Sequence, residues 1–159
     1  YARTTEIEFL DENRILTYGE SIFKNSTEED STCVVNLQTM RIEKKYSGVG
    51  LVNMKWSYRY HHKKKLLEFY EITGNQSFTI PDVKDSGDVI DVSGDYVLFG
   101  NLEEKKQAVY LIQLTNHTWK KMNIPRKLRN DMEIHLVKTQ KKILITNKKR
   151  AYLVDVSAL

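Results

Sequence analysis

The chain has 159 residues, of which 40% are hydrophobic and 29% are charged, and its formal net charge is +4. This length fits one domain of about 100–200 residues. No apolar run approaches the ~18 residues of a membrane-spanning helix, so we expect no membrane segment. The many tyrosines, phenylalanines and aliphatic residues are too much apolar mass for a disordered tail. The single cysteine, Cys33, excludes an internal disulfide and a zinc site built from thiolates.

Short apolar runs separated by turn residues recur along the chain, and helical periodicity is nearly absent. One stretch, residues 126–132, has helical character but is too short to be stable alone. In chain order, the predicted strands are Ile7–Leu10, Arg14–Tyr18, Thr32–Leu37, Arg41–Tyr46, Leu51–Tyr60, Leu66–Ile72, Ser77–Ile80, Val89–Val92, Tyr96–Phe99, Val109–Leu114, Thr118–Met122, Ile134–Val137, Ile143–Thr146 and Ala151–Val156. Many short strands with regular turns predict an all-β sandwich, barrel or propeller.

A repeat in the spacing distinguishes among these folds. The pairs Ile80–Pro81 and Ile124–Pro125 lie 44 residues apart, and each isoleucine is followed ten residues later by another, Ile90 or Ile134. A period of about 40–45 residues with four strands matches one propeller blade, a small sheet that must be covered by its neighbours. The repeat therefore predicts an all-β β-propeller, or partial propeller, of about four antiparallel four-stranded blades. A β-sandwich is the alternative.

The repeat also predicts how the blades divide the chain. We expect a single propeller-like domain or fragment over residues 1–159, with approximate blades at 5–48, 49–81, 88–125 and 132–159. The last of these lacks an outer strand. Either residues 1–5 supply that strand and close a ring, or the chain is completed by further chain from the same or another protein. The start at Tyr1 rather than Met favours the second interpretation.

The segment Val89–Met122 carries a family resemblance. It contains a strand, a turn at Ser93–Asp95, a strand ending at Phe99, a third strand at Val109–Leu114, and then Trp119. This order resembles the blades of WD-repeat and kelch-like propellers, without their Trp-Asp or double-glycine signatures. The resemblance implies rigid blades that present binding loops. We therefore expect a non-catalytic protein–protein interaction scaffold within a larger intracellular complex.

Positive charge is concentrated in the last third of the chain. Residues 101–159 carry thirteen Lys/Arg against five Asp/Glu. Such asymmetry predicts an acidic partner, although lysines also serve to solubilise hairpin tips and sheet edges. Other basic clusters lie at His61–Lys65 and Lys141–Lys142. The candidate partner-binding residues are Lys120, Lys121, Arg126, Lys127, Arg129, Lys148, Lys149 and Arg150.

Nucleic acid or another phosphate-bearing ligand is the alternative partner. Phosphates attract Lys and Arg, and single strands also stack on exposed aromatic rings. Trp56, Tyr58 and Tyr60 alternate beside the basic cluster at His61–Lys65, so one strand face would present all three rings. The competing interpretation is that this face packs on a neighbouring blade.

Catalytic and metal-binding signatures are missing. A distant alternative is a glycan-active propeller enzyme that uses the carboxylates of Asp82, Asp85, Asp88, Asp91 and Asp95. Their spacing is more typical of turns and strand ends, where Asp bonds backbone. The four histidines lack the spacing of a metal site. We therefore expect no enzymatic activity, no cofactor and no metal.

Two observations favour different cellular compartments. A lone cysteine and 25 Lys/Arg favour the cytoplasm or nucleus. Three glycosylation acceptor motifs, at Asn25, Asn75 and Asn116, favour secretion as the alternative.

Overall fold

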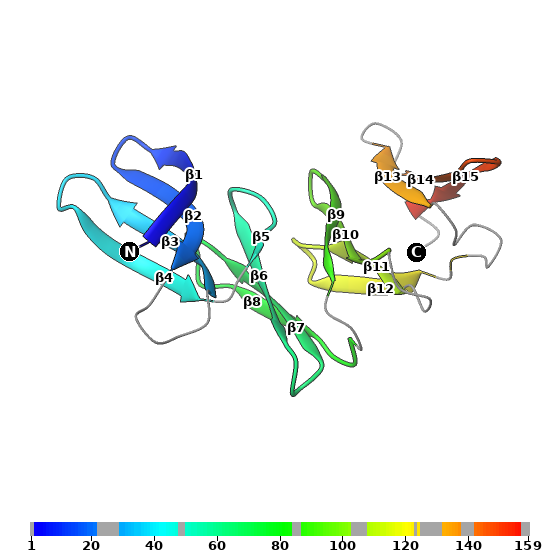
Figure 1. Ribbon diagram of the computed structural model, residues 1–159, viewed down its shortest axis with the longest axis horizontal. Helices are drawn as coiled ribbons and strands as arrows, with labels where there is room; N and C mark the ends of the chain where they lie inside the picture. The colour runs from blue at the N-terminus through cyan, green and yellow to red at the C-terminus, as the bar shows by residue number, and fades with distance from the viewer. Residues whose placement is uncertain are drawn as a thin grey trace. The chain divides into compact units, whose positions relative to one another are not determined.

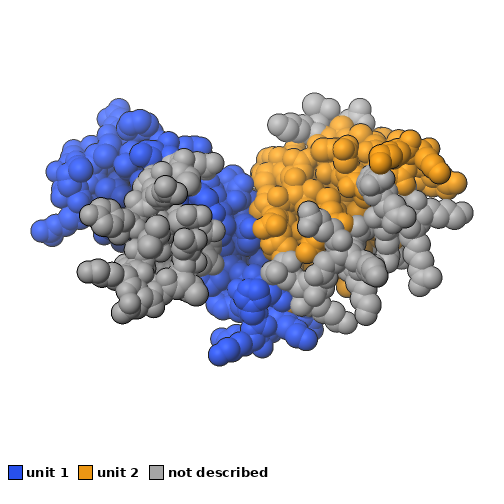
Figure 2. All heavy atoms as spheres, viewed as in Figure 1, with its two compact units in different colours: residues 1–82 blue, residues 83–159 orange. Residues whose placement is uncertain are grey.

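The computed structural model describes residues 2–21, 29–47, 50–83, 87–102, 108–122, 124, 132–137 and 142–156. These residues form antiparallel β-strands (Figure 1), and no α-helix occurs within the described ranges. The all-β prediction is confirmed. The chain divides into two compact units (Figure 2): unit 1 is Tyr1–Asp82 and unit 2 is Val83–Leu159.

Unit 1 contains two four-stranded sheets, and in each the strands are neighbours in chain order. Sheet A consists of β1 (Ala2–Asp11), β2 (Arg14–Ser21), β3 (Glu29–Asn36) and β4 (Arg41–Ser47). Sheet B consists of β5 (Gly50–Leu51), β6 (Trp56–His61), β7 (Leu66–Glu71) and β8 (Ser77–Ile80).

Unit 2 contains one four-stranded and one three-stranded sheet, again with strands in chain order. Sheet C consists of β9 (Asp88–Ser93), β10 (Tyr96–Asn101), β11 (Ala108–Gln113) and β12 (Thr118–Met122). Sheet D consists of β13 (Glu133–Val137), β14 (Lys142–Asn147) and β15 (Arg150–Asp155).

Sheets A and B of unit 1 pack through a seam that mixes apolar and polar contacts. Leu16 of β2, Val34 of β3 and Ile72 after β7 form its buried apolar cluster. Beside them, the rings of Tyr46 and Tyr70 lie 5.7 Å apart between centroids, and the Tyr46 hydroxyl donates to the Ile72 carbonyl at 3.3 Å. The seam of unit 1 therefore depends on hydrogen bonds as well as on apolar burial.

Sheets C and D of unit 2 pack through an aliphatic seam. Leu98 and Leu111 of sheet C belong to one buried cluster with Ile134 and Ile143 of sheet D. The register explains this, because Leu98 lies opposite Leu111, and Ile134 and Leu136 alternate along β13 toward the same face. One carboxylate adds a polar link between the sheets: Asp91 Oδ2 of β9 accepts a 2.7 Å hydrogen bond from the Leu136 N–H.

The repeated isoleucines contribute to the cores. Ile80 and Ile124 are both buried, and Ile80 is the last residue of β8, the fourth strand of sheet B. Pro81 therefore lies just past an outermost strand, where its missing N–H removes no ladder bond. Pro125 lies outside the described residues.

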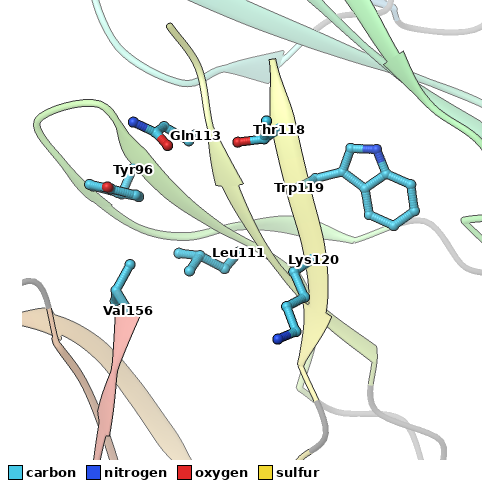
Figure 3. A pocket seen from close by; sticks show the side chains of 7 residues that line it. All are labelled: Tyr96, Leu111, Gln113, Thr118, Trp119, Lys120 and Val156. Atoms are coloured by element: carbon cyan, nitrogen blue, oxygen red, sulfur yellow. The ribbon is translucent and has the colours of Figure 1, made fainter. Parts of the chain in front are cut away.

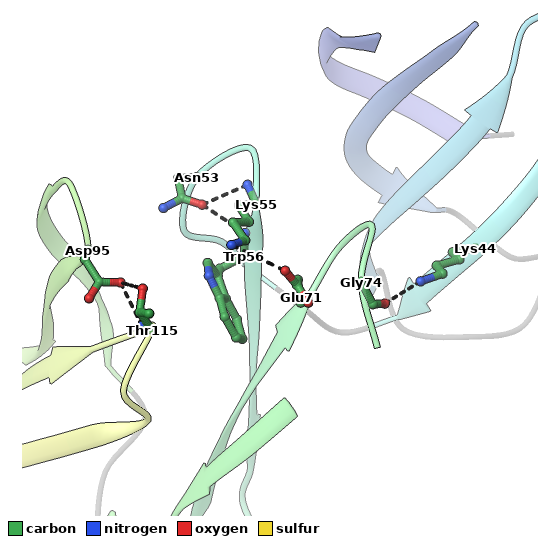
Figure 4. A network of polar contacts seen from close by, with 8 residues as sticks. All are labelled: Lys44, Asn53, Lys55, Trp56, Glu71, Gly74, Asp95 and Thr115. Atoms are coloured by element: carbon green, nitrogen blue, oxygen red, sulfur yellow. Dashed lines mark hydrogen bonds and ion pairs between the residues drawn. The ribbon is translucent and has the colours of Figure 1, made fainter. Parts of the chain in front are cut away.

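One expectation about strands is wrong in detail. The predicted strand Leu51–Tyr60 is two strands, β5 and β6, because Asn53 closes a turn between them. Its Oδ1 accepts the backbone N–H groups of Lys55 and Trp56, each at 2.9 Å (Figure 4).

Of the two alternatives for the missing strand of the last sheet, its supply by residues 1–5 is not borne out. Residues 2–4 belong to β1 and pair with residues 19–21 of β2, so they complete sheet A and leave sheet D with three strands. Of the candidate helix at 126–132, only Met132 lies within the described residues.

Candidate functional site

Two adjoining hollows in unit 2 form a groove along the seam between sheets C and D. The first has a volume of about 90 Å³ and the second a volume of about 380 Å³, and both are lined by Tyr96 and Val156. Because the hollows share these two residues, we treat them as one site, the seam groove. Its remaining lining residues are Leu111, Gln113, Thr118, Trp119 and Lys120 in the first hollow, and Ser93, Gly94, Asp95, Leu136, Val137 and Lys142 in the second.

Strand register places the polar lining residues of the first hollow on one face of sheet C. Tyr96 lies opposite Gln113, which lies opposite Thr118, and Leu111 lies opposite Lys120. Residues directly opposite each other in an antiparallel pair point to the same face. Figure 3 shows Tyr96, Leu111 and Val156 on one side of the strands, with the Trp119 ring extending away on the other.

The lining groups favour an anionic ligand. Lys120 contributes an ammonium to the first hollow and Lys142 contributes one to the second, while Gln113 and Thr118 offer neutral hydrogen-bonding groups. The only carboxylate among the lining side chains, Asp95, accepts hydrogen bonds from Thr115 N at 2.7 Å and Thr115 Oγ1 at 2.6 Å (Figure 4). Positive charge in a concave site raises the local concentration of anions.

The described candidates among the predicted basic residues lie on β12 and at the turn between β14 and β15. Lys120 and Lys121 follow each other on β12, so they face opposite ways; Lys120 lines the seam groove, and Lys121 Nζ lies 6.0 Å from the centroid of the Tyr110 ring. Lys142 joins Lys120 in the groove although it was not among the candidates. Its position in the basic cluster Lys141–Lys142 was a signal for it. The strand register that selects Lys142 could not be read from the sequence.

The other predicted basic residues lie elsewhere or are not described. Lys148, Lys149 and Arg150 are exposed at the turn between β14 and β15, where Asn147 Oδ1 accepts the N–H groups of Lys149 and Arg150. This turn geometry accounts for their place at the hairpin tip. Three further candidates lie outside the described residues: Arg126, Lys127 and Arg129.

The alternating aromatic residues of β6 are not equally exposed: Trp56 is buried, whereas Tyr58 and Tyr60 are half-buried. Trp56 is only 3% exposed, and its ring meets that of Phe78 at 5.8 Å between centroids. Tyr58 similarly meets Phe69 at 6.3 Å. These ring contacts lie within sheet B, and packing of this face on a neighbouring blade stays a prediction.

Two of the acidic residues proposed for catalysis, Asp91 and Asp95, accept hydrogen bonds that stabilise the fold. Asp91 accepts hydrogen bonds from the backbone N–H groups of Val92 and Leu136, and Asp95 bonds Thr115. Asp85 lies outside the described residues, and Asp82 and Asp88 are exposed. Among the side chains that the structure describes, no group of three or more His, Cys, Asp or Glu is arranged to hold a metal ion.

A network of ionisable groups lies on the β6–β7 hairpin of unit 1. His61 Nε2 lies 2.8 Å from Glu68 Oε2, and the Tyr70 hydroxyl donates to the same oxygen. Burial opposes ionisation of Glu68, but the hydrogen bonds from Tyr70 and His61 outweigh it and hold the pKa of Glu68 below its ordinary value. Burial and the bond to Glu68 raise the pKa of Tyr70 to about 12.

Solved structures with similar folds are β-propellers. The β-propeller domain of the trilobed protease from Pyrococcus furiosus, described as having an open velcro topology, matches with a TM-score of 0.51 at 11% identity. An orthorhombic crystal form of acylaminoacyl peptidase from Pyrococcus horikoshii matches with a TM-score of 0.50 at 16% identity. Together with the four antiparallel sheets, these likenesses show the fold. It is a β-propeller or part of one.

The likeness extends to part of each known chain. The protein matches over 97% of its own length in both cases, but it spans 58% of the trilobed protease propeller and 30% of the acylaminoacyl peptidase. No protein-family model and no curated protein matches the chain. No described helix is long and apolar enough to cross a membrane. The predicted glycosylation acceptors Asn75 and Asn116 are exposed in turns, and Asn25 lies outside the described residues.

Proposed function

We propose that the chain is a non-catalytic interaction module of the WD-like or kelch-like propeller type, and that the seam groove of unit 2 binds an acidic segment of a protein partner. The observation that carries this proposal is that Lys120 and Lys142 line one groove. Its lining carboxylate, Asp95, already accepts a hydrogen bond from Thr115. An extended acidic segment fits this chemistry because its carboxylates reach both ammonium groups while its backbone bonds Gln113 and Thr118. Such a partner agrees with the excess of positive charge in residues 101–159.

A binding measurement tests this function. We expect a fluorescently labelled peptide of alternating Glu and Gly to bind the full chain, with an affinity that falls as salt screens the charges. Lys120→Glu and Lys142→Glu should each weaken binding at least tenfold, since each replaces an attraction with a repulsion. Lys64→Glu, in the exposed turn between β6 and β7 of unit 1, makes the same charge change and should leave binding nearly unaltered. Equal losses in all three variants would mean that only net charge matters and would refute the groove.

A single-stranded oligonucleotide is the comparison ligand for the alternative function. Trp56, one of the three rings that favoured nucleic acid, is buried, which weakens the case for base stacking on this strand. We therefore expect weaker binding of an oligothymidylate than of the acidic peptide at equal salt. Tighter oligothymidylate binding that is lost in Lys120→Glu would assign the groove to nucleic acid instead.

A further inference from the structure

Two hairpins in different sheets present the same glycosylation acceptor motif, an asparagine followed two residues later by serine or threonine. In sheet B the motif at residues 75–77 leads into β8, and in sheet C the motif at residues 116–118 leads into β12. Ser77 and Thr118 are each the first residue of a fourth strand. The motif therefore recurs at one position of the repeat, the turn between the third and the fourth strand.

Both copies of the motif are accessible. The side chains of Asn75 and Asn116 are exposed, and so are those of Ser77 and Thr118. β8 and β12 are each the last strand in the order of their sheet, so a group attached beside them meets no further strand of that sheet. This position suits an oligosaccharide, which is bulky and hydrated and must lie on the surface.

The two motif asparagines lack the structural role that asparagine commonly has in a turn. There the side chain usually hydrogen-bonds nearby groups and holds the turn in shape. Four other described asparagines make side-chain hydrogen bonds of 2.8–3.0 Å: Asn13, Asn36, Asn53 and Asn147. Within the described part of the chain, neither Asn75 nor Asn116 makes such a bond. Their amide groups are therefore available to a modifying enzyme.

The cysteine content is compatible with an oxidising compartment. Cys33 is the only cysteine of the chain, and it is buried. A buried thiol is shielded from oxidants and from exchange with the disulfides of other proteins. The lone cysteine therefore does not oppose export of the chain.

We propose that Asn75 and Asn116 each carry an N-linked oligosaccharide, and that the chain is exported through a secretory route. The sugar comes from a lipid-linked oligosaccharide diphosphate, and an oligosaccharyltransferase catalyses the transfer. A bond forms between Nδ2 of the asparagine and C1 of the first sugar, while the bond from C1 to the diphosphate oxygen breaks. The lipid diphosphate leaves, and the amide loses one proton to the transferase. No oxidation or reduction takes place.

The first test maps sugars on the full chain purified from the cells that produce it. A peptide N-glycosidase acting in heavy-oxygen water converts each glycosylated asparagine to a labelled aspartate, which mass spectrometry locates. We expect the label at Asn75 and at Asn116. A chain without label at both positions would overturn the proposal, and label at only one would overturn the equivalence of the two turns.

The second test removes the asparagines one at a time. The full chain is translated behind a cleavable signal sequence in the presence of endoplasmic-reticulum membranes, and each attached oligosaccharide slows its migration on a denaturing gel. Asn75→Gln and Asn116→Gln should each remove one step of this shift, and the double variant should remove two. Asn147→Gln changes an asparagine outside any acceptor motif, so it is the matched control and should remove none.

Substitutions at the third residue of each motif complete the test. Ser77→Ala and Thr118→Val should each remove one step although both asparagines remain, whereas Ser77→Thr and Thr118→Ser keep the motif and should keep the step. A double Asn→Gln variant that migrates like the unaltered chain would overturn the assignment of the sites. Because the gel is denaturing, misfolding of a variant does not change this readout. Loss of acidic-peptide binding in Lys120→Glu leaves the number of steps unaffected, so the two proposals fail separately.

Discussion

The two units use the same local architecture but hold their sheets together differently. In unit 2, aliphatic side chains such as Leu98, Leu111 and Ile143 fill the seam between the sheets. In unit 1, the apolar cluster lies beside a tyrosine pair, and Lys44 Nζ crosses from β4 to the Gly74 carbonyl at 2.6 Å (Figure 4). Both seams therefore combine an apolar cluster with hydrogen bonds, but the cluster is larger in unit 2, and unit 1 adds the tyrosine pair and the Lys44 bond. The repeat therefore preserves strand pattern and length, whereas the chemistry between sheets varies from one pair to the next.

The largest expected difference between the units comes from core truncation. Ile143 in unit 2 and Ile72 in unit 1 are both 0% exposed, so Ile143→Ala and Ile72→Ala remove the same atoms. We expect Ile143→Ala to lower the free energy of unfolding by about 4 kcal/mol and Ile72→Ala by about 2 kcal/mol, because the tightly packed aliphatic seam leaves the larger cavity. Urea denaturation of both variants measures this. Equal losses would contradict the contrast between the seams.

The next effect concerns the polar link in unit 2. Asp91→Ala removes the acceptor of the Leu136 N–H between sheets C and D. We expect a loss of about 2 kcal/mol, since a half-buried donor loses its partner. Asp88→Ala, at the exposed first residue of the same strand, is the control and should change stability little. A similar loss in both variants would show that the link contributes nothing specific.

A smaller effect concerns the pH response of unit 1. Tyr70 has a pKa raised from 10.0 to about 12, so its contribution is full below pH 10 and is lost as the pH rises toward 12. Glu68 has a lowered pKa, so its contribution is full above its ordinary value of 4.5 and is lost at more acidic pH. Tyr70→Phe should lower stability at neutral pH by about 1 kcal/mol and flatten the decline above pH 10. Denaturation curves across pH measure both, and an unaltered alkaline decline would contradict this role.

The smallest effect should be equal in the two units. Met40 before β4 and His117 before β12 end equivalent hairpin turns with φ values of 53° and 54°. Glycine tolerates this left-handed conformation, so Met40→Gly and His117→Gly should each stabilise the chain by about 0.5 kcal/mol. Lys64→Gly, at a turn position without positive φ, should not stabilise. Thermal unfolding measures all three, and opposite signs for Met40 and His117 would show that the turns differ.

The fold could be predicted because the sequence signals that mark strands and turns are local. Alternating apolar residues and turn residues mark the strands, and the 44-residue spacing of Ile80 and Ile124 reports two buried positions, one at the end of β8 and one just after β12. The break after Leu51 was missed because its only signal is the side chain of Asn53, whose two backbone bonds create the turn.

The candidate site was harder to predict because it depends on register. Nothing in the order Lys120, Lys121 says which ammonium faces the groove; the pairing of Lys120 with Leu111 decides it. Similarly, His61 and Glu68 meet because the register pairs Arg59 with Glu68 and His61 with Leu66. This pairing places His61 and Glu68 on the same face of the hairpin. Register and the packing of one sheet on another are tertiary properties that a linear pattern leaves open.

The consecutive order of strands in every sheet has a consequence for how the chain acquires its structure. Each strand pairs with its neighbour in sequence, so the loops that must close are short and the average separation of contacting residues is low for an all-β protein. Sheet A needs no residue beyond Ser47 to complete its ladders. During synthesis, one sheet can therefore assemble on the ribosome before the next has been translated, with the seams forming as each successive sheet emerges.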